Sequence, residues 1–171
     1  METTKAIATR RSIRAFKPDP IKDSDLQTIL RAAKMAPIGR GLYDNVHITV
    51  VQKASLIDKI AAAAKQATGN DLSPNYGAST LIIVSGKPLG GLEIGNAACI
   101  VENMLIAATD LGLGSCYIWG AIHVTKDQKD IIAELHLPDG LVPVSAAAIG
   151  YAVTPADSEA EERPIGVNVV K

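Results

Sequence analysis

The sequence predicts a single α+β domain, 1–171, in which helices cover a central sheet. Its 171 residues are enough for one hydrophobic core without disulfide bridges. Several segments repeat apolar residues at the helical period, whereas other apolar runs are short, rich in β-branched residues and typical of strands. The longest helical pattern lies in the middle of the chain and is apolar around most of its circumference, so it needs protein on several sides.

The N-terminal segment predicts a short helix followed by a basic run. Thr3 or Thr4 is a suitable N-cap for a helix that ends near Ala8. The run 10–16, RRSIRAF, contains three of the six arginines of the chain and precedes two prolines that break regular structure. This run is the densest positive charge in the sequence.

A second helix is predicted to begin at Asp23 or Ser24, because Ser24 and Gln27 have the spacing of a capping box. Apolar residues lie on one face of this helix, which indicates that it packs on a core. Pro37 ends it, since proline cannot continue a helix.

Two strands with a helix between them are predicted next. The strand 46–51 alternates only loosely between polar and apolar residues, so we expect protein on both of its faces. A helix over 55–67 ends at Gly69, a residue suited to a left-handed cap. The run 81–84, LIIV, predicts a second buried strand.

The central helix covers 94–111 and places Asn96, Asn103 and Asp110 on one line along its surface. Glu102 and Thr109 form a second line, and Asn96, Glu102, Asn103 and Asp110 interrupt every run that approaches the ~20 apolar residues of a membrane span. The helix therefore requires either a thick core or a second subunit. Gly112 is placed for a left-handed C-cap that turns the chain back toward the sheet.

The C-terminal third predicts two more strands, 116–119 and 144–151, with a helix between them. Thr125 and Gln128 repeat the capping-box spacing at the head of that helix, which ends before Pro138. The second strand is rich in alanine, and such small side chains allow a helix to pack close to the sheet.

The tail, 154–171, is first acidic and turn-rich and then becomes apolar again. A chain that regains hydrophobicity after a polar linker usually docks on a surface. We expect this tail to dock on such a surface.

Composition excludes several functions. The net charge of -1 and the pI near 6.3 give no basic field for nucleic acid or for a membrane surface. Cys99 and Cys116 have neither disulfide nor metal-ligand spacing, which favours a reducing, cytoplasmic location. The N-terminus has no apolar signal core. The three histidines show no ligand spacing, so no metal site is expected.

Motifs for nucleotide binding and for nucleophilic catalysis are missing from the sequence. The turn Gly112-Leu113-Gly114 lacks the third glycine of a dinucleotide fingerprint and follows a helix instead of a strand. The chain contains neither a P-loop nor a nucleophile elbow. Cys116 is expected to be a small buried apolar residue.

The arginine run is the remaining candidate. Arg10, Arg11 and Arg14 bracket Ser12, and guanidinium forks with a hydroxyl suit a phosphate dianion, although a solvated basic loop has the same composition. Beside the glycine turn and apolar strand of 112–120, this run provides a phosphate end and a flat apolar end. That is the shape of a flavin mononucleotide (FMN) site.

The sequence resembles the nitroreductase family of flavin enzymes over nearly its whole length. The resemblance rests on ATRRSIRAF near the start, NAACIVENMLIAATDLGLGSCYIWG in the middle, the helix and PDG-containing turn after it, and AAAIGYA before the tail. It implies an α+β fold whose central mixed or antiparallel sheet is flanked by helices. It also implies an intertwined homodimer with the cofactor at the interface and with the tail, 154–171, docked on the partner subunit.

The resemblance implies that FMN is the cofactor and assigns its contacts. The arginine run would hold the phosphate and ribityl chain, the loop after the second helix would lie near the flavin, and the strand after the central helix would lie against the ring. A tail arginine would close on the phosphate. In chain order these residues are Arg10, Arg11, Ser12, Arg14, Pro37, Ile38, Cys116, Tyr117, Ile118, Trp119, Gly120 and Arg163.

The implied activity is ping-pong oxidoreduction, in which NADH or NADPH gives hydride to flavin N5 and a nitroaromatic, quinone or similar small acceptor then takes it. The chemistry belongs to the cofactor, so no catalytic side chain is expected. Two alternatives are an FMN-binding protein without turnover, as a store or sensor, and a flavin-modifying or dehalogenating branch of the same fold. The loop 38–45 lacks the serines and the Gln-Pro-Trp run of many relatives. Arg40 in this loop either faces a nicotinamide dinucleotide phosphate or pairs with Asp44.

Overall fold

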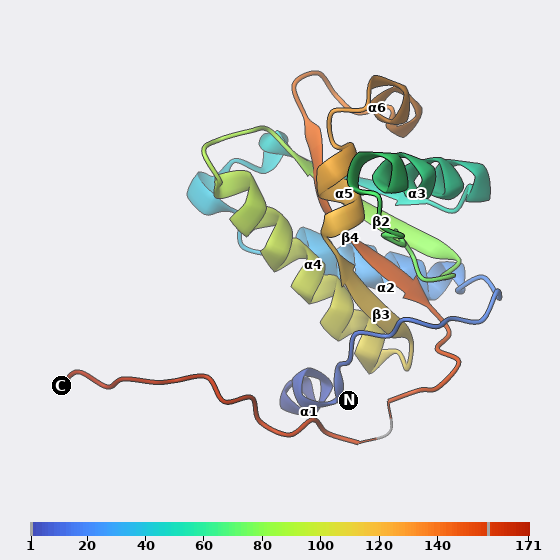
Figure 1. Ribbon diagram of the computed structural model, residues 1–171. Helices are drawn as coiled ribbons and strands as arrows, with labels where there is room; N and C mark the ends of the chain where they lie inside the picture. Colours follow the sequence, from blue (N-terminus) through green and yellow to red (C-terminus); the bar gives the residue numbers. More distant parts are fainter. Residues whose placement is uncertain (1, 157) are drawn as a thin grey trace.

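The computed structural model describes residues 2–156 and 158–171 and shows a sheet between two layers of helices (Figure 1), which confirms the α+β prediction. The sheet has four strands in the order β1-β2-β4-β3, and every neighbouring pair is antiparallel. All four lie where the sequence predicts strands. Their bounds are β1 (Val46–Val51), β2 (Thr80–Gly86), β3 (Gly114–Ile118) and β4 (Val142–Gly150).

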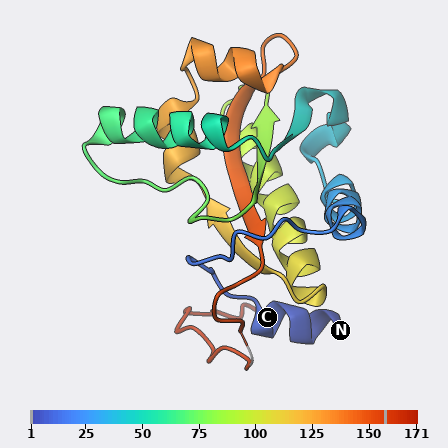
Figure 2. The ribbon, with the colours of Figure 1, turned by 90° about the vertical axis from the view of Figure 1, so that its right-hand side faces the viewer.

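Helices cover both faces of the sheet. Figure 2 shows α3 and α5 on one side, with α2 and α4 on the other. Two separate apolar cores fill these layers, one against each face. The helices are α1 (Thr3–Thr9), α2 (Asp23–Lys34), α3 (Ala54–Thr68), α4 (Leu92–Asp110), α5 (Gly120–Thr125) and α6 (Lys129–Leu135), and the 3-10 turns are η1 (Gly39–Gly41) and η2 (Tyr43–Asn45).

The alanines of β4 face both cores. Ala146 and Ala148 lie in the core under α3 and α5, whereas Ala147 lies in the core under α4, and all three are completely buried. The small side chains leave room for the helices to approach the strand, as predicted.

Both predicted capping boxes are wrong. The N-cap of α2 is Lys22, which makes no side-chain cap bond, and Ser24 Oγ turns to the carboxylate of Asp25 instead. Thr125 lies at the end of α5, a helix that the sequence analysis missed, and its hydroxyl donates to the carbonyl of Ala121 at 2.7 Å. Both hydroxyls therefore donate hydrogen bonds to nearby oxygens instead of capping a helix N-terminus.

The end of α4 is the predicted left-handed cap. Gly112 has φ of 74°, and its N–H donates to the Thr109 carbonyl at 3.0 Å. The N–H of Leu113 reaches back to the Ala108 carbonyl at 2.8 Å, which completes a Schellman motif. This turn delivers the chain directly into β3.

The strand β1 differs from its prediction. It lies at the edge of the sheet and pairs only with β2. All of its residues except Val51 are half-exposed, so the expected cover on both faces is wrong for the single chain. An edge strand with apolar residues can accept a further strand.

An ion-pair network joins α3 to α6. Lys59 Nζ lies 2.9 Å from Asp130 and 2.8 Å from Glu134, and Lys53 Nζ lies 3.0 Å from Glu134. The hydrogen bond from Lys59, followed by that from Lys53, lowers the pKa of the Glu134 carboxyl. A carboxyl with a lowered pKa stabilises the fold above its unfolded-state pKa, and this stability is lost as pH falls through the folded-state value.

Glu134→Gln is therefore expected to lower the urea midpoint slightly at neutral pH. The difference from the unmodified protein should disappear at a pH below the carboxyl's folded-state pKa, because both proteins are then neutral at this position. Glu161→Gln, in the exposed tail, is the control and should change neither midpoint. An equal deficit of Glu134→Gln at both pH values would contradict the assignment.

Candidate functional site

The arginine run lies beside the first half of β3. Ser12 forms an isolated parallel bridge with Ser115, and the N–H of Ile13 donates to the Ser115 carbonyl at 2.9 Å. In this extended backbone successive side chains point to opposite sides. This alternation groups Arg10, Ser12 and Arg14, which we call the basic face, and separates Arg11 from them. Within the basic face the Arg10 side chain turns to Glu102 of α4 and the Arg14 side chain to Tyr76.

Arg14 and Ser12 are exposed on the basic face. The Arg14 guanidinium lies 5.8 Å from the centroid of the Tyr76 ring, and no carboxylate pairs with it within the part of the chain that the structure describes. Arg10 differs, because its Nε lies 3.3 Å from Glu102 of α4, with the two side chains 30% and 47% exposed. The charge of Arg10 is thus partly offset, while that of Arg14 is available.

Cys116 lies beneath the basic face and is only 2% exposed. Burial raises the pKa of its thiol, against the opposing effects of the Arg14 charge, a hydrogen bond with Ser12 and the Arg10 charge. Burial has the largest of these effects. The thiol therefore stays protonated at neutral pH. Cys116 is a small buried apolar residue, as the sequence predicts, and not a nucleophile.

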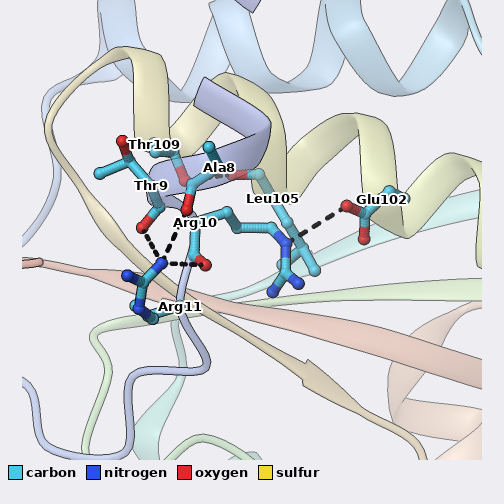
Figure 3. A network of polar contacts seen from close by, with 7 residues as sticks. All are labelled: Ala8, Thr9, Arg10, Arg11, Glu102, Leu105 and Thr109. Atoms are coloured by element: carbon cyan, nitrogen blue, oxygen red, sulfur yellow. Dashed lines mark hydrogen bonds and ion pairs between the residues drawn. The ribbon is translucent and has the colours of Figure 1, made fainter. Parts of the chain in front are cut away.

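Arg11 does not join the other predicted phosphate ligands. Its Nη1 donates to the carbonyls of Ala8, Thr9 and Arg10 at 2.9, 2.9 and 3.1 Å, and its Nη2 donates to the Ser158 carbonyl at 2.8 Å. Figure 3 shows the guanidinium turned toward the end of α1, while Arg10 points to Glu102.

The predicted ring-binding strip, 116–120, does not present all of its side chains to one side. Cys116 and Ile118 face the core under α3 and α5, whereas Tyr117 faces the core under α4. Trp119 is 44% exposed and lies outside the strand, where its ring stacks on His123 with centroids 4.2 Å apart. A flat ligand on this strip would therefore contact the backbone and alternate side chains only.

Gly120 begins α5 at the end of this strip. A Cβ added there would lie 3.6 Å from Leu72 Cδ1, an ordinary van der Waals contact, so the position has room for a methyl group. Ser115, beside the basic face, and Ile118, at the end of β3, are three residues apart along the strand, about 10 Å. The strip thus has a basic end and an apolar end at a spacing that suits an elongated phosphate ester.

Pro37 and Ile38 lie elsewhere in the single chain. They precede η1, which is fixed to the first half of α4 by a hydrogen bond from the Gly39 N–H to Asn96 Oδ1 at 2.8 Å. In Figure 1 this cyan segment lies at one end of α4 and α1 lies at the other. The chain alone does not bring these two residues to the basic face.

Two further arginines have exposed positions. Arg163 lies in the tail, which runs away from the domain in Figure 1. Arg40 has φ of 61°, an uncommon value for a residue other than glycine, and stands exposed between two glycines. The described residues show no ion pair between Arg40 and Asp44, one of the two expected alternatives.

Sequence reasoning missed three residues around the site: Tyr76 under Arg14, Glu102 beside Arg10, and Asn96, which fixes η1. Asn96 and Glu102 left a signal, since both are polar residues on a mostly apolar central helix, and Asn96 shares its line with Asn103. Asn103 Nδ2 donates to the Ala32 carbonyl at 3.0 Å and ties α4 to α2. The polar line thus fastens neighbouring segments to α4.

Comparison with known proteins agrees with this architecture. The family model described as the nitroreductase family matches residues 7–151. A protein of Archaeoglobus fulgidus, provisionally named NADH dehydrogenase/NAD(P)H nitroreductase, is 31% identical over 95% of this chain and 92% of its own length. Two solved nitroreductases with bound FMN match this chain over the full length of both proteins. The one from Bacteroides fragilis has a TM-score of 0.83 and 28% sequence identity, and the one from Desulfitobacterium hafniense has a TM-score of 0.86 and 23% sequence identity.

The fold and the matched length define an α+β protein of the nitroreductase type. The chain belongs to the nitroreductase family.

Proposed function

We propose that the protein is an FMN-dependent oxidoreductase that uses NADH or NADPH to reduce a small acceptor such as a nitroaromatic or a quinone. The observation that carries this proposal is the basic face of Arg10, Ser12 and Arg14 beside β3. Its donor set, two guanidiniums and a hydroxyl, fits a phosphate dianion. The names of the relatives support the proposal. One of them is an FMN reductase (NADPH) of Bacillus subtilis, which is 23% identical to this chain, and the match covers 65% of its length.

The residues divide the binding of FMN between them. Arg14 and Ser12 provide the free charge and the hydroxyl for the phosphate, and Arg10 adds a charge that it shares with Glu102. The backbone at the end of β3 and at Gly120 would lie against the flavin ring. FMN when bound supplies the hydride chemistry, so no side chain has to act as an acid, a base or a nucleophile.

A shared surface for nicotinamide and acceptor has a kinetic consequence. With NADPH and a quinone each varied at fixed concentrations of the other, double-reciprocal plots should give parallel lines, because one product leaves before the second substrate enters. Intersecting lines would mean that both substrates bind together and would contradict a single shared surface.

We also propose that the active protein is a homodimer. By length and composition alone α4 could cross a membrane, which differs from the sequence prediction. Within the chain 39% of its most apolar stretch is buried. Ile94 and Cys99 of this helix are exposed. A second subunit would cover this surface and would bring its own Pro37 and Ile38 toward the basic face. Both cysteines are free, which suits a reducing cytoplasm.

The tail is proposed to dock on that second subunit along β1. Ile165, Val167 and Val169 alternate along the tail and are 79%, 82% and 74% exposed, which is the pattern of an unpaired strand. Next to β1, between α2 and α4, lies an apolar groove of about 390 Å³. A free edge strand beside an apolar groove suits the addition of such a strand.

Val167→Asp with Val169→Asp is therefore expected to shift the protein from dimer to monomer at micromolar concentration, measured by light scattering. Burying two carboxylates in an apolar groove opposes docking strongly. Val170→Asp, on the opposite side of the tail strand, is the matched control and should leave the dimer intact. An unchanged dimer mass in the double variant would show that the tail docks elsewhere.

A further inference from the structure

Arg11 is the one member of the arginine run with no place in the proposed phosphate site. Its Nη1 donates to three carbonyls at the end of α1, those of Ala8, Thr9 and Arg10. The last carbonyls of a helix lack partners within the helix and carry a partial negative charge. The guanidinium therefore caps α1, and these carbonyls offset its charge.

The other nitrogen of the same guanidinium fastens the C-terminal segment. Arg11 Nη2 donates to the Ser158 carbonyl at 2.8 Å, across 147 positions of sequence. A second bond acts beside it, from the N–H of Ala160 to the carbonyl of Ala8 at 2.8 Å. Two hydrogen bonds thus hold this segment against the end of α1.

A small cavity lies beside these two hydrogen bonds. It has a volume of about 140 Å³ and is enclosed between Arg11, the turn after α4 and the tail residues Pro155 and Ala156. The described residues of this segment, 155, 156 and 158–160, therefore lie along the end of α1 and the start of β3. A solvated arginine that merely capped a helix would not account for these contacts with the tail.

We infer that Arg11 is a positioning residue, which fixes the C-terminal segment on α1 so that Arg163 can reach the phosphate held by the basic face of the same subunit. Ala8, the anchor of Ala160, stands two residues before Arg10. Arg163 follows Ala160 by three residues, about 10 Å of extended chain, so the anchored segment confines its side chain to this neighbourhood. The inference rests on the proposed FMN site.

A double-mutant cycle tests the coupling. FMN dissociation constants are measured for the unmodified protein, Arg11→Ala, Arg163→Ala and the double variant. Arg11→Ala should weaken FMN binding roughly tenfold on its own and have no further effect when Arg163 is already alanine, because both changes remove the same contact. The same tenfold loss in the Arg163→Ala background, or no loss from Arg11→Ala alone, would overturn the inference.

Proteolysis provides a readout that does not depend on the cofactor. Cleavage after Glu161 and Glu162 by a glutamate-specific protease should be faster in FMN-free Arg11→Ala than in the FMN-free unmodified protein. Arg11→Lys should behave like Arg11→Ala, since one ammonium cannot bridge the helix end and the tail as the guanidinium does. Arg10→Ala, of the same charge change, is the control and should not accelerate cleavage.

Equal cleavage rates in Arg11→Ala and Arg10→Ala would overturn the inference that Arg11 holds the C-terminal segment on α1. Thermal midpoints of the variants identify any general unfolding, which would accelerate cleavage at many sites instead of at the tail alone. If the protein bound no FMN, the proposed function would fail, while the proteolysis would still decide whether Arg11 holds the tail.

Discussion

Arg14→Ala should weaken FMN binding at least tenfold while the binding of riboflavin, which lacks the phosphate, stays nearly unchanged. A hydrogen bond to a charged group contributes about 1.5–3 kcal/mol, and the described part of the chain offers Arg14 no carboxylate that would offset its charge. Arg10→Ala should have a smaller effect, because Glu102 already shares the charge of Arg10. Fluorescence titration of both flavins measures the ratio directly.

The control for this prediction is Arg31→Ala on α2. Arg31 is exposed and lies outside the basic face, so its removal changes the net charge equally without touching the proposed site. Equal FMN affinity in Arg14→Ala and Arg31→Ala would place the phosphate elsewhere. A parallel loss of riboflavin in Arg14→Ala would mean that the residue supports the ring end instead.

Gly114→Val should destabilise the fold by about 1–3 kcal/mol or more. A Cβ at Gly114 would lie 3.0 Å from Ala152 Cβ, 3.1 Å from Phe16 Cε1 and 3.2 Å from Ile13 Cγ2. Phe16 and Ile13 belong to the N-terminal segment, and Ala152, which follows β4, forms a β-bridge with Phe16. Urea unfolding of the variant should show a clearly lower midpoint.

Gly120→Ala is the matched control, because its new methyl group would meet only Leu72 Cδ1 at 3.6 Å, an ordinary contact. Its stability should stay close to that of the unmodified protein. An unchanged midpoint for Gly114→Val would contradict the close packing at this junction. The structure thus predicts different effects for two glycines of the segment 112–120 that the sequence alone does not distinguish.

The sequence predicted the strands and the long helices because each repeats its apolar period over enough residues to be distinctive. The helix α5 was missed because it spans only Gly120–Thr125 and follows Trp119, which looks like the end of an apolar strand. The capping boxes failed for another reason: Ser24 and Thr125 satisfy local neighbours that spacing alone does not reveal.

The candidate site was predicted in part. By residue type alone, Arg10, Arg11 and Arg14 are equally good candidates for phosphate ligands. Only the extended backbone of this run shows that the Arg11 side chain points away from the other two. The period of two could have found this division once the run was read as extended. The sequence does not reveal that Pro37 and Ile38 lie away from the basic face, because this depends on how the chain folds around α4.

The proposal of a flavin-dependent oxidoreductase is tested most directly by the visible absorption of the FMN-loaded protein without oxygen. On addition of NADPH the absorption band of the bound cofactor should disappear, and on addition of a quinone it should return, with NADPH consumed and hydroquinone formed in equal amounts. A band that persists after NADPH and after NADH would contradict the account and favour a protein that stores or senses FMN.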